Sequence, residues 1–244
     1  MIPGPCYRFL MEIEHLSLHR LDHVGSLPDV VVVIDVLRSF STAASAFMQG
    51  ARAIYPVDGP SEGFVLHRQL PEALLVGAQP GGRPVMGFDL PNSPVSMASA
   101  SGLQSCDLIL STAAGVRGLL RFSAAPTLFA CGLVNAQATA QAILELAPRR
   151  VALLATGEWV DRDGDEDFAC ADLITAYLRH QPIKPEMFER RVRHSDFGRR
   201  FDGSEPHLPV ADLDWCARAN VMDFAMLATR DDSLDRRLIL RPLR

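Results

Sequence analysis

The sequence is poor in lysine, in aromatic residues, in basic runs and in long apolar runs, and the last two shortages exclude classes of partner. Lys184 is the only lysine among 244 residues, and aromatic side chains make up 7% of the chain. The net charge is −5, with no basic run that could follow a phosphate backbone, so we expect no nucleic-acid partner. No apolar run reaches the roughly 20 residues that a transmembrane helix needs, so we expect no membrane partner.

Cysteine pairs are also missing. The five cysteines are scattered and form no C-x-x-C motif, which argues against a zinc site and against a disulfide framework. The first residues, MIPGPCYRFLMEIEH, lack the basic lead of a signal peptide. We therefore expect a cytoplasmic protein.

Several catalytic motifs do not occur. The sequence has no G-x-S-x-G elbow, no Walker A loop and no G-x-G-x-x-G after a strand, which argues against serine hydrolases, P-loop enzymes and dehydrogenases. Phosphatases with an aspartyl nucleophile carry a second aspartate two residues after the first. Leu37 stands at that place after Asp35, so this pattern is absent too.

What is present is an alternation of apolar runs and helical patterns. It predicts an α/β fold, a three-layer α/β/α arrangement with a mostly parallel central sheet, in a single domain over residues 1–244. Residues 182–244 are more charged and less periodic, and residues 77–94 form a loop rich in glycine and proline. The expected strands are 30–36, 53–57, 73–77, 107–111, 127–130, 151–155 and 238–240; the expected helices are 39–50, 115–122, 135–146, 166–179 and 212–220.

The stretch VVVIDVLRS (Val31–Ser39) places two charges at the end of a run that otherwise suits a buried strand. A buried ion without a partner is costly, so Asp35 and Arg38 need partners. An ion pair between them that only stabilises the strand end is one interpretation. The other is a ligand site, because ligands of open parallel sheets bind beyond the carboxyl ends of the strands.

Further polar residues follow the other expected strands, and we expect them on the same rim. Carboxylates on this rim suit Mg²⁺, and an arginine can bind a phosphate through two hydrogen bonds. The two residue types together indicate phosphoryl-group chemistry. The acidic run DRDGDED (Asp161–Asp167) can also be read as a solvated loop with favourable helix-start charges. The rim candidates are Asp35, Arg38, Arg83, Asp89, Asn92, Ser93, Thr112, Gly115, Asn135, Glu166 and Asp167.

Five motifs in this order carry a family resemblance. They are VVIDVLRS (32–39), GFDLPNSP (87–94), STAAG (111–115), GLVNA (132–136) and EDFACA (166–171). Together they resemble the 2-phosphosulfolactate phosphatases, the ComB enzymes of coenzyme M biosynthesis, over residues 30–178. The resemblance implies an α/β/α fold and a Mg²⁺-dependent phosphatase that converts 2-phospho-3-sulfolactate to 3-sulfolactate and phosphate. A homodimer is the default expectation for a soluble oligomer.

The resemblance also implies roles for the matching residues. Asp35, with Glu166 or Asp167, would hold Mg²⁺. Arg38 and the turn Asn92–Ser93 would bind phosphoryl oxygens, and Asp89 would orient the attacking water or protonate the leaving group. The remaining substrate-binding candidates are Arg83, Thr112, Gly115 and Asn135.

The chain departs from the family pattern at three places. Residues 77–82 read GAQPGG where the family usually has G-E-R-G-G, and residues 112–116 read TAAGV where it usually has T-N-G-T. Pro91 replaces the glycine before Asn92. Two alternatives therefore stay open: a diverged enzyme with a different phosphorylated substrate, and a non-catalytic anion-binding protein on the same fold.

Overall fold

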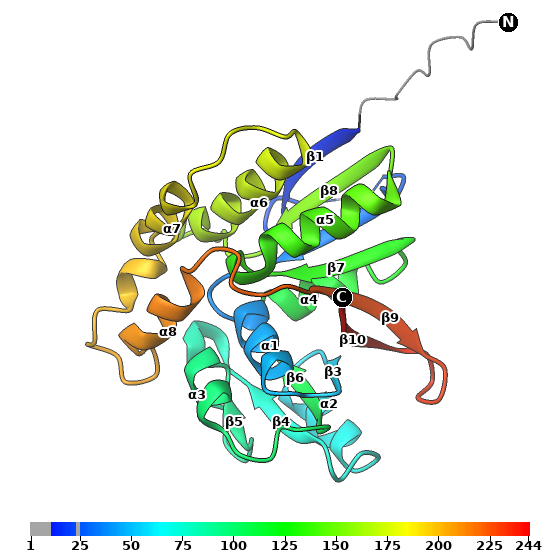
Figure 1. Cartoon of the computed structure of the whole chain (residues 1–244). Helices are drawn as coiled ribbons and strands as arrows, with labels where there is room; N and C mark the ends of the chain where they lie inside the picture. Colours follow the sequence, from blue (N-terminus) through cyan, green and yellow to red (C-terminus); the bar gives the residue numbers. More distant parts are fainter. Residues whose placement is uncertain (1–10, 23–24) are drawn as a thin grey trace, which may run out of the picture.

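The computed structural model describes residues 11–22 and 25–244, so Cys6 lies outside the described residues. A ten-stranded sheet forms the centre, and helices lie on both of its faces (Figure 1). The strands are β1 Glu12–Ser17, β2 Val30–Ile34, β3 Ala53–Pro56, β4 Leu74–Gly77, β5 Leu90–Pro91, β6 Asp107–Ser111, β7 Thr127–Cys131, β8 Arg150–Ala155, β9 Ala225–Asp231 and β10 Arg237–Leu243. The helices are α1 Ser39–Met48, α2 Pro60–His67, α3 Pro94–Ser99, α4 Gly115–Arg121, α5 Ala136–Leu146, α6 Asp165–Leu178, α7 Pro185–His194 and α8 Val210–Cys216, with short 3₁₀ turns η1 Pro80–Gly82, η2 Leu133–Asn135 and η3 Gly198–Arg200.

The sheet consists of two parallel groups of strands joined by an antiparallel hairpin. Its order is β1-β8-β2-β7-β9-β10-β3-β6-β4-β5. The pairs within β1-β8-β2-β7 and within β3-β6-β4-β5 are parallel, whereas β7–β9, β9–β10 and β10–β3 are antiparallel. Because three successive pairings are antiparallel, the two parallel groups run in opposite senses along the sheet. The mostly parallel sheet of the sequence prediction is confirmed, but it is not one uninterrupted parallel sheet.

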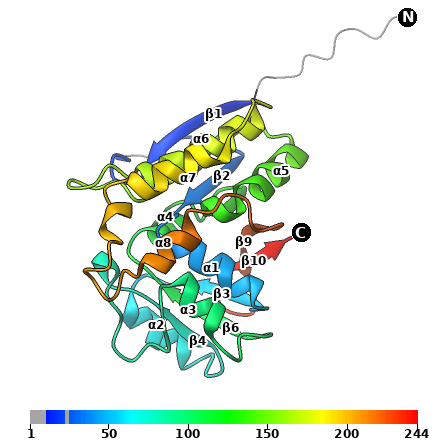
Figure 2. The same cartoon turned by 60° about the vertical axis from the view of Figure 1, so that its left-hand side comes forward.

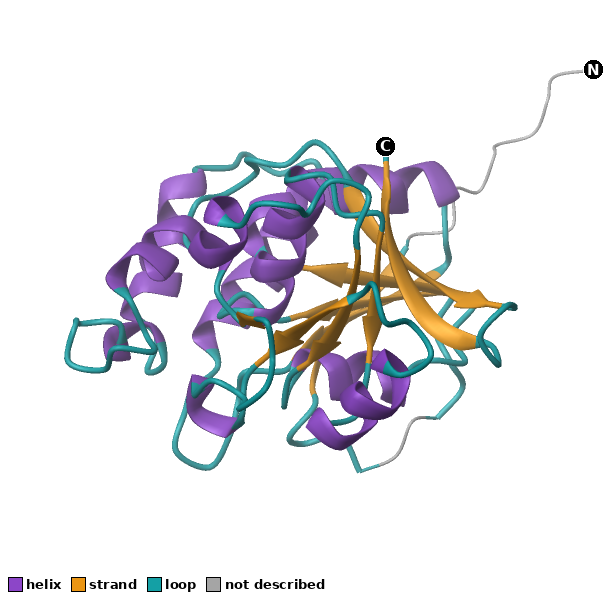
Figure 3. Ribbon diagram, turned by 90° about the horizontal axis from the view of Figure 1, so that it is seen from below, coloured by secondary structure: helices purple, strands orange, loops and turns teal. Residues whose placement is uncertain are grey.

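Three layers result, and the side chains of β2 show how. Val31 and Val33 face an inner core that α1 and α4 share, whereas Val30 and Val32 on the opposite face pack in the core of α5 and α6. The second group of strands has α2 on its outer face, where Leu66 is fully buried. Figure 2 shows α5, α6 and α7 together over the first group, and Figure 3 shows helices on both sides of a strongly twisted fan of strands.

Helix α1 lies in the inner layer between the two parallel groups and contacts α3, α4 and β7. Its sequence SFSTAASAFM is dominated by small residues, and residues 39–47 are all buried. Small side chains allow neighbouring elements to approach it closely. Because α1 follows β2 after only four residues, it fixes the segment that carries Asp35.

The longer apolar runs of the sequence form strands close to where the pattern predicts them, and residues 107–111 match fully. Elements that the sequence reading missed are β1, α2, α3, α7 and β9. Within residues 77–94 the chain forms η1, β5 and the start of α3, where the Ser93 hydroxyl caps the helix by accepting a bond from the Ser96 N–H at 3.1 Å.

In the part of the chain that the structure describes, no helix is both long and apolar enough to cross a bilayer. The four described cysteines are free thiols, and the sulfurs of Cys131 and Cys170 lie 4.0 Å apart in a thiol–thiol hydrogen bond and not in a disulfide.

Candidate active site

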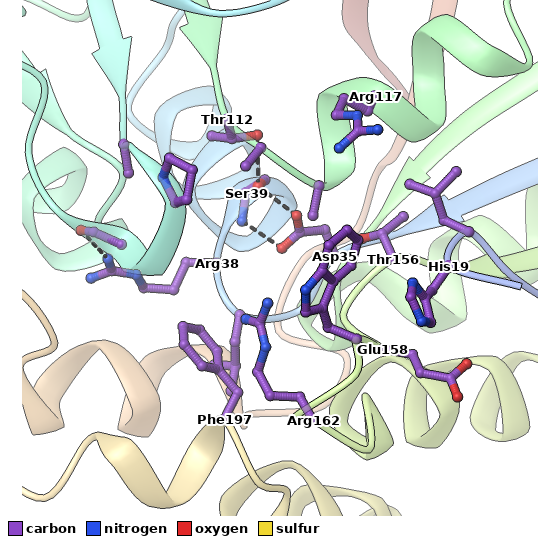
Figure 4. Close-up of a pocket in the computed structure, with 18 of the residues that line it drawn as sticks. His19, Asp35, Arg38, Ser39, Thr112, Arg117, Thr156, Glu158, Arg162 and Phe197 are labelled. Atoms are coloured by element: carbon purple, nitrogen blue, oxygen red, sulfur yellow. Dashed lines mark hydrogen bonds between the residues drawn. The ribbon is translucent and has the colours of Figure 1, made fainter.

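A cavity of about 870 Å³ lies beyond the carboxyl ends of β2, β4, β6 and β8. Its walls come from segments far apart in the sequence: residues 18–22, 35–39, 78–82, 112–121 and 156–162, with Asn92 and Phe197. The two parallel groups of strands therefore meet at this cavity, because the carboxyl ends of both contribute to its lining. Figure 4 shows the side chains of the cavity around Asp35.

Asp35 is the acid at the centre of this wall. Its Oδ1 accepts the backbone N–H of Ser39 at 2.9 Å, and its Oδ2 accepts the Ser39 hydroxyl at 2.6 Å and the Gly115 N–H at 2.8 Å. Burial raises the pKa of Asp35, and these hydrogen bonds oppose the rise. The three donors fix the orientation of a carboxylate that is only 4% exposed.

Gly115 is needed at its position because of space. A Cβ atom there would lie 2.8 Å from Asp35 Oδ2 and 3.0 Å from the ring of Phe40. No other residue therefore allows the first turn of α4 to approach Asp35 this closely. The hydroxyl oxygen of the neighbouring Thr112 lies 2.9 Å from that of Ser39, and Thr112 also lines the cavity. Because Ser39 donates its one hydroxyl proton to Asp35, Thr112 is the donor of this second bond.

Two further acids at the start of α6 lie behind Asp35 and do not line the cavity. Asp167 accepts the backbone N–H groups of Val36 at 2.8 Å, Thr156 at 2.9 Å and Gly157 at 2.7 Å, so it ties the ends of β2 and β8 together. Burial, then the charges of Glu166 and Asp35, raise the pKa of Asp167 well above its usual range.

Glu166 has fewer hydrogen-bond partners than Asp167. Burial raises the pKa of Glu166 to about 7, and the carboxylates of Asp163 and Asp35 add to the effect. Its Oε2 atom is buried without a hydrogen-bond partner. A bound cation would stabilise the ionised form of this carboxyl group and give its unpaired oxygen a partner. Glu166 therefore suits the role of a metal ligand.

The fit of a metal ion to the acids can be tested on this geometry. Among residues 11–22 and 25–244, no three His, Cys, Asp or Glu side chains form a ready-made metal site. Asp167 already receives three backbone N–H groups, whereas Glu166 retains an unpaired oxygen and Asp35 borders the cavity. Asp35 and Glu166 therefore fit a divalent cation better than Asp167 does.

Arg38 lines the cavity but does not pair with Asp35, and its guanidinium is engaged by other partners. Its Nη1 donates to Asp212 Oδ2 at 2.6 Å and to the His207 carbonyl at 3.0 Å, and its Nη2 donates to the Gly82 carbonyl at 3.2 Å. The side chains of this ion pair are 3% and 0% exposed. Figure 4 shows the guanidinium pointing away from Asp35.

Asp212, on α8, is a central residue that the sequence reading did not place in the site. It binds Arg38 and also accepts the Ser93 hydroxyl at 2.7 Å and the Val95 N–H at 3.2 Å. Ser93 is thus engaged in holding α3 and α8 together. Its neighbour Asn92 lines the cavity, and the buried Oδ1 of Asn92 has no hydrogen-bond partner.

Ser93, Gly115, Glu166 and Asp167 lie next to the cavity wall without lining it, and three further predicted site residues lie outside the cavity. Asp89 is exposed and accepts the Leu75 N–H at 2.7 Å, at the amino end of β4 and so away from the strand end that borders the cavity. Arg83 is exposed and does not line the cavity. Asn135 is the last residue of η2 and is buried, and its Oδ1 accepts the Gly132 N–H at 2.9 Å.

Six charged residues of the cavity wall were not among the sequence candidates, and three of them stand out: Arg117, Glu158 and Arg162. Arg117 follows the Thr112–Gly115 turn, and Glu158, which pairs with Arg20, follows β8. Arg162 is the one basic residue of the run DRDGDED, which the sequence analysis interpreted through its acidic residues. The rule that points to strand ends could have found Glu158 and Arg117, since both come shortly after a strand.

Comparison with known proteins agrees with this arrangement. A family model described as 2-phosphosulpholactate phosphatase matches residues 16–230. The chain belongs to the 2-phosphosulfolactate phosphatase family. A relative from Bacillus subtilis, a probable 2-phosphosulfolactate phosphatase, is 32% identical over 88% of this chain and 94% of its own length. Relatives of the same description from Carboxydothermus hydrogenoformans and Synechocystis are 36% identical over 79% and 71% of this chain and over 83% and 71% of their own lengths.

The departures from the pattern of the 2-phosphosulfolactate phosphatases lie on the cavity wall. Ala113 and Ala114 line it where the family usually has an amide and a small residue, and Gln79 and Pro80 line it in place of an acid and an arginine. The positions at which the sequence departs from the family motifs therefore include four residues of the cavity wall.

Proposed function

We propose that this protein is a Mg²⁺-dependent phosphatase that hydrolyses the phosphate ester of a small anionic 2-hydroxy acid. By family membership the expected substrate is 2-phospho-3-sulfolactate, which yields 3-sulfolactate and phosphate. The observation that carries the proposal is a buried, firmly oriented carboxylate, Asp35, on the wall of a cavity that arginines also line. Family membership supports the reaction class, because the family consists of phosphoric monoester hydrolases.

In this reaction Asp35 borders the ester and orients the attacking water, a role that Asp89 does not have the position to fill. Thr112 and Asn92 are the neutral polar side chains of the same wall and would contact phosphoryl oxygens. Asn92 suits this role because its side chain is 6% exposed and its Oδ1 is unpaired, so its amide is free to turn toward a ligand.

Mg²⁺, when bound, would neutralise phosphoryl charge and lower the pKa of a water molecule, and Asp35 and Glu166, with Asp167 behind them, would hold it. The unpaired Oε2 atom of Glu166 supports this assignment. The cytoplasmic location, the homodimer and the link to coenzyme M biosynthesis remain expectations.

The test is phosphate release by the purified protein from a panel of phosphorylated hydroxy acids, with and without Mg²⁺. Asp35→Asn should abolish release while leaving ligand binding mostly intact, because the amide keeps the shape of the side chain and loses its charge. Equal rates on sulfonated and plain esters would indicate a diverged substrate. Absence of release from every ester would support a non-catalytic anion-binding protein.

The diverged enzyme is favoured by one specific observation. The residues that replace the family's usual polar groups, among them Gln79 and Ala113, lie on the cavity wall and not on a remote surface. A single lost charge-assisted contact in a dry site costs on the order of 1.5–3 kcal/mol. A substrate that no longer needs those contacts would explain their loss.

A further inference from the structure

We propose that Arg162 is the arginine that binds the phosphoryl oxygens of the substrate, an inference that rests on the proposed phosphatase function. Arg162 lines the same cavity as Asp35. Figure 4 shows its guanidinium beside Phe197 and pointing toward the carboxylate of Asp35. It comes from the loop between β8 and α6, and in Figure 4 it approaches Asp35 from below, whereas the guanidinium of Arg38 is turned away to the left.

Arg38 lines the same cavity but is less suited to this task. Three of its five N–H groups already donate, to Asp212 and to the carbonyls of His207 and Gly82, and its guanidinium lies 5.5 Å from the ring of Phe201. A phosphate would have to compete with a carboxylate that is 0% exposed. Such a carboxylate cannot regain water if it loses its cation.

The donors of Arg162 are free by comparison. Within residues 11–22 and 25–244, its guanidinium makes no hydrogen bond, and its one ion pair joins Nε to Asp161 Oδ1 at 3.7 Å. The Asp161 side chain is 78% exposed, so water screens this pair and it contributes little. The planar fork of Arg162 can therefore form two parallel bonds to a phosphoryl group.

The position of Arg162 is fixed before a ligand arrives. Its backbone N–H donates to the Trp159 carbonyl at 3.2 Å, and its carbonyl accepts the Trp159 N–H at 3.1 Å, which closes the loop into a tight turn. Its guanidinium lies 5.1 Å from the centre of the Phe197 ring. That ring is held in turn by Arg200 at 5.2 Å and by the edge of Phe201 at 5.7 Å. Binding therefore orders little additional structure, which favours affinity.

The competing candidate is Arg117, which is exposed on the first turn of α4 and also lines the cavity. Among the residues that the structure describes, no aromatic ring stacks on its guanidinium, unlike that of Arg162. Arg121 is less suited, because its Nη2 donates to the Asp22 carbonyl at 3.3 Å. These differences make Arg162 the arginine with the best-defined position on the wall.

The first test is calorimetric titration of the full-length protein with inorganic phosphate. Arg162→Gln should weaken the affinity about 10- to 100-fold, the effect of losing a charge-assisted pair of bonds. The phosphate affinity of Arg162→Lys should lie between those of the parent protein and Arg162→Gln, because a lysine keeps the charge but cannot form two parallel hydrogen bonds. Arg117→Gln and the exposed control Arg218→Gln should stay within about threefold of the parent protein. Unchanged affinity in Arg162→Gln, or a loss confined to Arg117→Gln, would overturn the assignment.

The second test separates the failure of this inference from the failure of the proposed function. Release of phosphate is measured from 2-phospho-3-sulfolactate and from 2-phospholactate, which share the phosphoryl group and differ in the sulfonate. Arg162→Gln should lower kcat/KM by a similar factor for both esters. A loss for the sulfonated ester alone would assign Arg162 to the sulfonate and refute the proposal. If the parent protein hydrolyses neither ester, the proposed function fails, whereas the titration still decides the role of Arg162.

Discussion

The buried pair Arg38–Asp212 predicts a large loss of stability on substitution of Asp212 by Asn. The two side chains are 3% and 0% exposed, and 2.6 Å separates Arg38 Nη1 from Asp212 Oδ2. The asparagine would leave the arginine buried without its counter-charge, at a cost of about 3–5 kcal/mol. For a domain of this length each kcal/mol lowers Tm by about 2–4 °C, so we expect a decrease of roughly 6–20 °C.

Thermal unfolding followed by circular dichroism, together with urea titration, measures this loss. The matched control is Asp214→Asn on the same helix. Asp214 binds Arg193 at the same distance of 2.6 Å, but the side chains of that pair are 59% and 39% exposed. Exposed pairs contribute about 0–1 kcal/mol, so the control should unfold close to the parent protein.

Two results would refute this reasoning. If the Tm of Asp212→Asn lies within about 2 °C of that of Asp214→Asn, burial does not determine how much an ion pair contributes to the stability of this protein. If Arg38→Gln leaves stability unchanged and removes phosphate affinity, Arg38 is a ligand-binding residue, as the sequence first suggested. The double variant Arg38→Met, Asp212→Leu should recover much of the stability, because it removes both buried charges.

Three further predictions concern the acids of the site. Gly115→Ala places a Cβ 2.8 Å from Asp35 Oδ2, so it should lower kcat and reduce stability by about 1–3 kcal/mol; full activity would show that this contact does not position Asp35. In the metal-free protein, Glu166 binds its proton up to about pH 7 when folded and only up to its ordinary value of 4.5 when unfolded. Stability should therefore fall by roughly 3 kcal/mol as the pH rises from 4.5 to 7, and urea titrations at several pH values should show a flatter profile for Glu166→Gln. Saturating Mg²⁺ should raise Tm at pH 8 more than at pH 5, where protons compete for the acids, and an equal rise at both values would contradict a role for Glu166 in metal binding.

Much of the fold could be predicted from the sequence because buried parallel strands are nearly continuous apolar runs. Residues 30–34 and 107–111 are such runs, and both form strands. β1, with the sequence EIEHLS, is a half-exposed edge strand in which polar and apolar residues alternate, so no apolar run marks it. β9 was missed because the expected βαβ rhythm provides for no antiparallel strand between the two groups.

The site could be predicted only where a charge directly follows a buried strand. Asp35 met this condition, and it borders the cavity. Asp89 stands in a loop that turns back and pairs β5 in parallel with β4, which puts it at the other end of the strand. The partner of Arg38, Asp212, lies 174 positions later in the chain, and no local pattern could have linked the two.

The hairpin formed by β9 and β10 imposes an order of assembly on this protein. Residues 225–243 lie between two groups of strands that are made much earlier during synthesis. Each group can collapse onto its own helices while the ribosome is still working, but β7 and β3 have no shared neighbour until these last residues emerge. The edges of β7 and β3 stay unpaired until the hairpin has been synthesised. Folding therefore depends on contacts between distant parts of the chain and should be slow. Until then the open edge of either group could pair with another nascent chain, which makes the hairpin a safeguard against aggregation.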